Sequence, residues 1–486
     1  MTYKSIIYSA LLVLTILLGS CTEGFDEMNQ DPNNPTYVPT SYLLSSAQTN
    51  LVEEFLGRYN VGANWNLLAM RYMQHWSSTL YTDHDRYLTI EGDFSQIYNG
   101  GLRDLEEIIR LNTLPASLVE AAMSGANSNQ IGVAKILRAW AFHNLTDIWG
   151  DVPYSEALKE SENVTPAYDS QELIYNGIIA ELNDAYMMID EQAEPVKGDL
   201  IYAGDMGKWK RFAQSLKLRL GMRLTEVDPA KSEIIVRQAL QAGVFTSNEQ
   251  DAAYVYEGSV PHVSPWFNEF VLTTITFAVT NTLIDKLMAL NDPRLPFFAE
   301  RATDLGAYIG MPYGVNAAIA GSIRNEEVSL PANRIIGPTF PSFLQTYEEV
   351  LFLKAEAAAR GWLMEDPAVL YLEAVGTSLS HWGVSASAIE SYLNQPEIAY
   401  DVTNFRKSIG DQKWFALYLQ GMESWAEWRR LDYPELVKAP DAASGREIPR
   451  RKGYPITEIS LNLESYNAAV SRQGPDEMST RVWWDK

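Results

Sequence analysis

The chain has 486 residues, of which 46% are hydrophobic, and its formal net charge is −24 at pH 7. This hydrophobic content supports a sizeable core and excludes global disorder. The acidic balance argues against binding to nucleic acid, which needs Lys and Arg side chains to neutralise phosphates, and against docking by charge onto an anionic membrane. A single cysteine excludes a disulfide framework, so packing must stabilise the fold.

The N-terminus has the features of a secretory signal. Lys4 precedes an uncharged apolar run over residues 6–18, which is shorter than the ~20 residues needed to span a bilayer. The run ends in Leu-Gly-Ser before Cys21, and this ending resembles a bacterial lipoprotein signal. We therefore predict that residues 1–20 are a lipoprotein signal peptide and that Cys21 becomes the lipidated first residue. The alternative is an ordinary secreted protein with one free thiol.

A tether and one large domain are expected after the signal. Residues 21–40 contain several Asn, Asp and Pro residues, which favour turns and interrupt helices. We predict that this flexible segment holds the folded body away from the lipid. The remaining residues, 41–486, are predicted to form a single domain.

Apolar residues at three- and four-residue steps predict a mostly α-helical domain. Its first helical region, 41–243, begins near Leu43, and the pattern continues through Trp76. One helix is expected to open at Asp169, with Glu172 three positions on as in a capping box. The other helices in this region are expected over residues 131–149, 209–224 and 229–243.

The helical periodicity fades over residues 244–345. This segment is rich in Gly, Pro, Ser and Asn, and we predict a loop-rich insertion. Helices resume over 346–430, where residues 347–362, residues 367–382 and the run from Trp414 to Trp428 each fit one helix. The last residues, 431–486, are predicted to be Pro-rich coil.

Small residues at the expected helix contacts indicate paired helices of the tetratricopeptide type, in which each pair covers the apolar face of its neighbour. They include Ala355, Ala357, Ala358 and Gly361. The repeat consensus does not recur cleanly at a ~34-residue period. An irregular helical domain is therefore the alternative.

Several short motifs are spread from the middle of the first helical region to the end of the chain. The motifs are LTDIWGDVPY at 145–154, PAYDSQ at 166–171, SLKLR at 215–219, NDPRL at 291–295, AEA at 355–357, QKW at 412–414, WRR at 428–430 and WWD at 483–485. Together they resemble the SusD/RagB family of nutrient-binding outer-membrane lipoproteins. The resemblance spans roughly residues 25–485 and includes the lipoprotein leader.

The resemblance implies an α-helical fold with tetratricopeptide-like helix pairs on one side and ligand-binding loops on the other. It also implies a partner, a SusC-like TonB-dependent barrel in the outer membrane of a Gram-negative bacterium. A lipid-anchored member facing the cell exterior captures a glycan or a peptide and releases it into this barrel. The helix pairs are expected to face the barrel.

Most family-like motif residues are expected to have structural roles. Four are predicted to brace the end of the helix that finishes at residue 149, namely Asp147, Trp149, Asp151 and Tyr154. Four arginines are expected to be buried partners of carboxylates, because a bidentate Arg–carboxylate pair can hold a loop to a helix. They are Arg219, Arg294, Arg429 and Arg430.

The sequence shows no motif for catalysis or for a cofactor. No phosphate loop or nucleophile elbow is present, and no carboxylate pair can be nominated for glycoside hydrolysis. The five histidines are scattered and the lone cysteine is assigned to lipidation, so no metal site is predicted. Asp83-His84-Asp85 is interpreted as a solvated loop, and a structural calcium ion, known in some family members, is left open without an EF-hand motif.

Recognition is therefore the chemistry to expect. Sugar rings stack on Trp and Tyr, whereas a peptide uses backbone hydrogen bonds and pockets. We predict that aromatic residues in loops or at helix edges line the binding face, and the alternative is that they fix these loops to the core. The candidates are Trp266, Phe267, Tyr308 and Tyr313, with Trp76 and Tyr81 as additions. A surface hydrolase and a scaffold that binds only proteins are the competing functions.

Overall fold

The computed structural model describes residues 38–57, 64–159 and 162–486. The predicted signal peptide, Cys21 and nearly all of the predicted tether lie outside these residues. Within the described part of the chain, no helix combines the length and the apolar character needed to cross a membrane.

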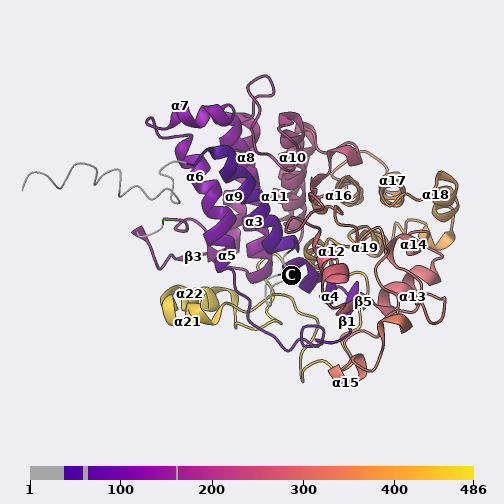
Figure 1. Cartoon of the computed structure of the whole chain (residues 1–486). Helices are drawn as coiled ribbons and strands as arrows, with labels where there is room; N and C mark the ends of the chain where they lie inside the picture. Colours follow the sequence, from indigo (N-terminus) through magenta and orange to yellow (C-terminus); the bar gives the residue numbers. More distant parts are fainter. Residues whose placement is uncertain (1–37, 58–63, 160–161) are drawn as a thin grey trace, which may run out of the picture.

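The body of the protein is an array of helices that pack in sequence-adjacent pairs (Figure 1). Helix α8 packs on α9, α10 on α11, and α16 on α17. The principal helices are α3 (Thr40–Val52), α6 (Arg103–Leu111), α8 (Asn127–Trp149), α9 (Gln171–Met188), α10 (Met206–Arg223), α11 (Pro229–Ala242), α16 (Tyr347–Ala359), α17 (Pro367–His381), α19 (Phe405–Ala416) and α20 (Gly421–Leu431). The prediction of a mostly α-helical fold with tetratricopeptide-like pairs is confirmed.

Strands are short and serve to join loops to this array. Within the described residues there are three two-stranded antiparallel sheets, and in two of them the paired strands are far apart in the chain. They are β1 (Trp76–Ser78) with β5 (Phe277–Val279), β2 (Val152–Pro153) with β3 (Tyr168–Asp169), and β4 (Ala252–Tyr254) with β6 (Ser342–Gln345). The β1–β5 sheet therefore ties the loop-rich segment to the first helical region, whereas the β4–β6 sheet joins the two ends of the loop-rich segment to each other.

Shorter helices lie around the array (Figure 1). They are the π-helices η1 (Glu53–Gly57), η2 (Tyr98–Leu102) and η6 (Asn268–Leu272), and the α-helices α4 (Trp65–Tyr72), α5 (Ser95–Ile97), α7 (Leu118–Ala121), α12 (Pro265–Phe267), α13 (Asn281–Ala289), α14 (Leu295–Phe298), α15 (Ala317–Ala320), α18 (Ala386–Leu393), α21 (Ile456–Leu461) and α22 (Leu463–Gln473). Helices α21 and α22 overturn the prediction that residues 431–486 are only coil.

Two helix boundaries differ from the sequence-based expectation. Helix α9 is capped by Ser170, whose side chain accepts a hydrogen bond from the Leu173 N–H, whereas Asp169 lies in β3. The long helix expected from Trp414 to Trp428 is two helices, because Leu419 adopts a left-handed backbone conformation with φ of 70° between α19 and α20. Helical spacing on both sides of the turn concealed this break.

Gly421, the first residue of α20, allows this helix to pack directly on α4. A Cβ atom at Gly421 would lie 2.4 Å from both the Asn66 carbonyl oxygen and the Met70 backbone nitrogen. Any larger residue at this position would force α20 and α4 apart. Gly421 directly follows the turn between α19 and α20, so the end of this turn is also the point where α20 contacts α4.

A network of buried ion pairs joins the helices at the centre of the array. Arg219 on α10 binds Glu349 on α16 at 2.6 Å, and Arg430 on α20 binds Glu356 on α16 at 2.5 Å. Glu427 on α20 receives Arg430 at 2.6 Å, and it also pairs with Arg223 of α10 and Lys413 of α19. The prediction that Arg219 and Arg430 are buried partners of carboxylates is confirmed, and so is that for Arg294, which binds Asp292 at 2.6 Å.

Arg429 is the exception among the four arginines. Its guanidinium donates to the backbone carbonyls of Asp147 and Arg450, and it lies 4.0 Å from the Trp425 ring centroid and 4.7 Å from that of Trp484. Burial lowers the pKa of Arg429 to about 10, although the nearby Asp147 and Asp485 carboxylates act to raise it. Carbonyl oxygens and aromatic rings thus take the place of the predicted carboxylate partner.

The predicted bracing of the α8 end is confirmed. Asp147 accepts hydrogen bonds from the Tyr175 hydroxyl at 2.6 Å and from Trp484 Nε1 at 2.7 Å. Trp149 is fully buried and donates from Nε1 to the Gly453 carbonyl. Asp151 accepts from the Gln171 N–H and pairs with Arg472, and the Tyr154 hydroxyl donates to Glu181.

The ion-pair network predicts a large stability loss when one partner is removed. Glu427→Gln leaves Arg430, Arg223 and Lys413 with less compensating charge, and we expect the free energy of unfolding to fall by about 3–5 kcal/mol. Equilibrium urea unfolding measures this change. Glu233→Gln, which removes the exposed pair with Arg237, is the matched control and should change the free energy by less than about 0.5 kcal/mol. Equal small effects from both variants would contradict a central role for the network.

Candidate ligand-binding site

A cavity of about 550 Å³ opens beside the β2–β3 sheet. Its wall comes from three segments: residues 94–103 around α5 and η2, the connection between β2 and β3, and α21 with the residue that follows it. A volume of this size matches the usual range for small-molecule sites in proteins. The cavity therefore lies in the helical region, away from the loop-rich segment in which the sequence placed the binding face.

An aromatic pair stands at this cavity: Tyr98 is half-buried, and Phe94, of which 5% is exposed, packs against it. The rings of Phe94 and Tyr98 meet edge to face with their centroids 5.6 Å apart. The Tyr98 hydroxyl donates to the Pro153 carbonyl at 2.6 Å, and the ring also contacts Phe142. Because the hydroxyl and the ring are both fixed before any ligand arrives, an apolar ligand face could contact this wall at little cost in side-chain entropy.

Polar groups and exposed apolar groups surround the aromatic wall. The polar lining residues are Ser95, Asn99, Arg103, Asn163, Glu458 and Asn462. Two of them support the wall itself, since Glu458 accepts from the Tyr168 hydroxyl at 2.7 Å and Asn462 donates to the Pro166 carbonyl at 2.9 Å. Val164 and Leu461 stand at the cavity with 80% and 72% of their surface exposed. Amides, an apolar rim and aromatic rings together suit a neutral ligand with both hydroxyl groups and apolar faces.

Three of the six aromatic candidates from the sequence are buried and do not stand on an open face. Trp76 has no exposed surface, and its Nε1 donates to the Tyr418 hydroxyl at 2.8 Å. Trp266 is 2% exposed and meets Trp76 edge to face at 4.9 Å. Tyr313 is 6% exposed, with its hydroxyl 3.3 Å from that of Tyr87. These side chains fix the loops to the core, which was the alternative interpretation.

The other three candidates remain at the surface. Tyr81 is 62% exposed, whereas Phe267 and Tyr308 are half-buried. The Arg301 guanidinium lies 4.6 Å from the Tyr308 ring centroid, so one face of this ring is already covered. Ligand binding by these three residues stays a prediction.

Sequence reasoning did not single out Phe94, which precedes α5, or Tyr98, which begins η2, because aromatic residues four positions apart are also typical of a helix packed on the core. The only available signal was an aromatic pair four residues apart next to Gly100 and Gly101, where η2 departs from regular helix geometry. The partners of this pair, Pro153 and α21, come from distant parts of the chain. Their convergence is a property of the fold and is not visible as a motif.

Two groups of potential metal ligands have contrasting surroundings. The expected solvated loop at Asp83-His84-Asp85 is wrong for Asp85, which is fully buried and receives Arg71 Nε at 2.5 Å and the Ser78 N–H at 2.8 Å. Within the described residues, one group of His, Asp and Glu side chains brings its ligand atoms within 4.8 Å of one another: Asp251, Glu348 and His381. No motif indicates this group, because its members are far apart in the chain.

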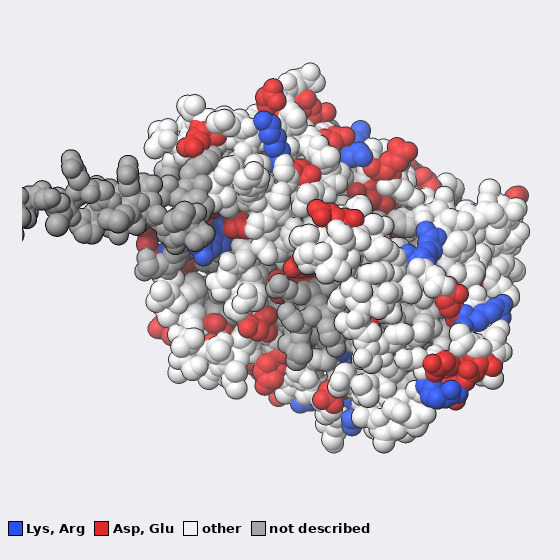
Figure 2. Space-filling model, in the orientation of Figure 1, with Lys and Arg blue, Asp and Glu red and all other residues white. Residues whose placement is uncertain are grey.

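Charge at the surface agrees with a neutral ligand. On the face shown in Figure 2, acidic side chains are spread among uncharged ones, and Lys and Arg lie singly or in small groups. Such a surface offers nucleic acid no continuous basic track on this face. The fold and the cavity together define a class: a helix-repeat protein with a preformed, aromatic-walled site.

Comparison with known proteins identifies the family. A family model named SusD-like, described as starch-binding and associating with the outer membrane, matches residues 32–455. The chain therefore belongs to the SusD-like family, which consists of binding proteins associated with the outer membrane. The resemblance found in the sequence is confirmed. Among curated proteins, none matches this chain.

Solved structures agree over nearly the whole fold. A chitin-binding protein is 28% identical, with a TM-score of 0.77 over 92% of this chain and 100% of its own. A SusD homolog from Bacteroides uniformis is 24% identical, with a TM-score of 0.79 over 92% of this chain and 99% of its own. A chitin-binding SusD homolog from Flavobacterium johnsoniae is 21% identical, with a TM-score of 0.74 over 91% of this chain and 98% of its own. The last two support the fold alone.

Glu269 on η6, next to the buried Trp266, predicts a pH-dependent stability. Burial raises the pKa of Glu269 to about 7, and one of its carboxylate oxygens has no hydrogen-bond partner among the described residues. The folded state therefore favours the protonated form of Glu269, and proton uptake by this carboxyl stabilises the folded protein at low pH. This stabilisation is lost as the pH rises from about 4.5 to about 7. At pH 8 we expect Glu269→Gln to have a higher melting temperature than the unchanged protein. At pH 5 the difference in melting temperature should be smaller.

Thermal unfolding of both proteins at the two pH values measures this difference. Glu326→Gln, at an exposed position in the same loop-rich segment, is the control. A difference for Glu269→Gln that is the same at pH 5 and pH 8 would contradict a buried carboxyl that takes up a proton.

Proposed function

We propose that this protein is a lipid-anchored cell-surface receptor that binds a neutral oligosaccharide in the Phe94–Tyr98 cavity and delivers it to a SusC-like TonB-dependent barrel. The single observation that carries the proposal is the preformed cavity with its fixed aromatic wall. Sugar rings have an apolar face that packs on such a wall, and their hydroxyls match the amide groups around it.

The comparisons support the chemical class of the ligand. Starch appears in the description of the matching family, and the relative at 28% identity is a chitin-binding protein. Both polymers are uncharged, which agrees with the acidic surface of this chain and its formal charge of −24. An anionic glycan would be repelled by this surface, whereas a neutral one would not.

Family membership and the predicted leader support the proposal of a transporter partner. A capture protein needs a route for its ligand across the outer membrane, and a separate barrel would supply this route. The acyl chains on Cys21 would keep the receptor beside it, because more than one chain anchors a protein lastingly to a bilayer.

Filling the cavity tests the binding site. Ala157 lines the cavity, and Ala157→Trp should weaken binding of chito- or malto-oligosaccharides by at least about tenfold, equivalent to about 1.4 kcal/mol. Ala386→Trp, at an exposed position on α18, is the matched control and should leave affinity unchanged. Isothermal titration calorimetry measures both, with circular dichroism to verify folding.

Tyr81→Ala distinguishes this site from the loop-rich face. The proposal expects Tyr81→Ala to bind as tightly as the unchanged protein. If Tyr81→Ala loses affinity and Ala157→Trp does not, the ligand binds at the loop-rich face and the cavity assignment is wrong. If neither oligosaccharide series binds at all and a peptide library does, the ligand class is wrong.

Cys21→Ser tests the anchor. Without the thiol no acyl chain can be attached, so we expect incorporation of a clickable palmitate analogue to be abolished and the protein to leave the outer-membrane fraction. The unchanged protein should remain in that fraction and co-purify with a TonB-dependent barrel. Equal fractionation of both proteins would contradict lipid anchoring through Cys21.

A further inference from the structure

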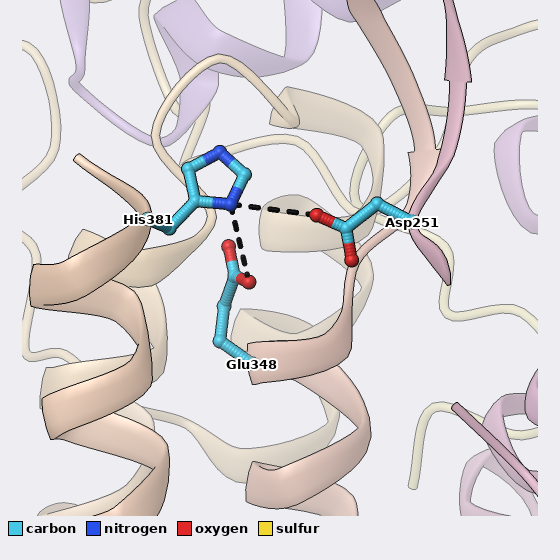
Figure 3. A group of neighbouring side chains, drawn as sticks. All are labelled: Asp251, Glu348 and His381. Atoms are coloured by element: carbon cyan, nitrogen blue, oxygen red, sulfur yellow. Dashed lines mark ion pairs between the residues drawn. The ribbon is translucent and has the colours of Figure 1, made fainter. Parts of the chain in front are cut away.

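Three potential metal ligands from separate elements meet at one point beside the α16–α17 pair (Figure 3). Asp251 precedes β4, Glu348 lies in the first turn of α16, and His381 is the last residue of α17. His381 Nδ1 lies 3.4 Å from Asp251 Oδ2 and 3.6 Å from Glu348 Oε2. Both carboxylates point toward the same ring nitrogen.

The spacing of these atoms fits the edges of a metal coordination polyhedron. Charge-assisted N–H···O hydrogen bonds are about 2.7–2.9 Å long, so both distances from His381 Nδ1 are too long for a good one. Tetrahedral Zn²⁺ has bonds of about 2.0–2.1 Å to His nitrogen and carboxylate oxygen, which places neighbouring ligand atoms roughly 3.3–3.4 Å apart. The two distances from His381 Nδ1 are thus already close to the spacing that a bound ion would require, and the two carboxylates offer oxygens within 4.8 Å of each other.

An unsatisfied buried atom independently points to a ligand. Glu348 is 1% exposed, and its Oε2, the atom that faces His381, has no hydrogen-bond partner among the described residues. A buried carboxylate oxygen without a partner is unfavourable. A cation between Glu348 and His381 would compensate this charge.

Neighbouring groups hold Asp251 and His381 in place. Asp251 Oδ1 accepts the Tyr347 N–H at 2.7 Å, which leaves Oδ2 directed toward His381. The Phe343 ring meets the His381 ring edge to face at 5.2 Å. Such outer contacts orient ligands at metal sites and limit their movement.

We propose that Asp251, Glu348 and His381 bind one Zn²⁺ ion, with a water molecule as the fourth ligand. One imidazole nitrogen and two carboxylate oxygens are donors that Zn²⁺ accepts in tetrahedral geometry, whereas Ca²⁺ requires six to eight oxygens. The two carboxylates balance the charge of the ion. The His381 side chain is 17% exposed, so solvent can reach the open position.

The ion would act as a structural link. Asp251 belongs to the loop-rich segment, whereas Glu348 and His381 belong to a helix pair, so one ion would fix the start of β4 to both helices. This role goes beyond ligand capture and requires no glycan.

Metal binding to the full-length protein in detergent tests the site. After removal of metal with a chelator, equilibrium dialysis against Zn²⁺ should give one ion per chain. His381→Gln and Glu348→Gln should each weaken Zn²⁺ binding by roughly tenfold or more, as changes at metal sites commonly do. His262→Gln, at an exposed histidine outside the cluster, is the matched control and should bind as the unchanged protein does. No bound Zn²⁺, or equal binding by His381→Gln, overturns the proposal.

Co²⁺ provides a second measurement that needs no variant. Co²⁺ in this site should give the strong visible absorption of tetrahedral coordination, and added Zn²⁺ should abolish it while excess Ca²⁺ should not. A weak, octahedral-type spectrum or displacement by Ca²⁺ would contradict the site. In that case a protonated His381 held between the two carboxylates explains the cluster.

Discussion

Buried charge pairing at the centre of the helix array is the constraint on which the rest of the structure depends. Arg219 and Arg223 on α10 and Arg430 on α20 each face carboxylates from other helices. Removing charges from water is costly unless each ion finds its partner with good geometry. These helices therefore cannot slide or rotate without leaving an unpaired ion, and their relative positions are fixed more strictly than apolar packing alone would require.

The loops and the cavity are attached to this fixed array. Strand β2 leads directly from the braced end of α8, and it carries the Pro153 carbonyl that holds the Tyr98 hydroxyl. The cavity wall therefore derives its rigidity from the same helix that contributes Asp147 to the ion pairs. In the same way, the Asp251 group joins the loop-rich segment to the ends of α16 and α17.

The sequence predicted the long helices well and the site poorly, for physical reasons. Helices such as α10 and α16 repeat their apolar residues over several turns, and local spacing is sufficient to find them. The left-handed conformation of Leu419 divides α19 from α20, and the four residues between these helices include no glycine or proline, although Gly421 follows directly. Aromatic residues in loops or at helix edges were candidates either for the binding face or for the core, and Trp76 and Trp266 pack on each other in the core. Burial depends on which distant segments meet, and local composition does not encode this.

The closing residues complete the first half of the core. Trp484 donates to Asp147, the Gly453 carbonyl accepts from Trp149, and the Lys452 N–H donates to the Ile148 carbonyl. A polypeptide that is synthesised from its N-terminus cannot form these bonds until residues 452–484 have been made. The end of α8 therefore lacks these partners until the segment that supplies them has left the ribosome.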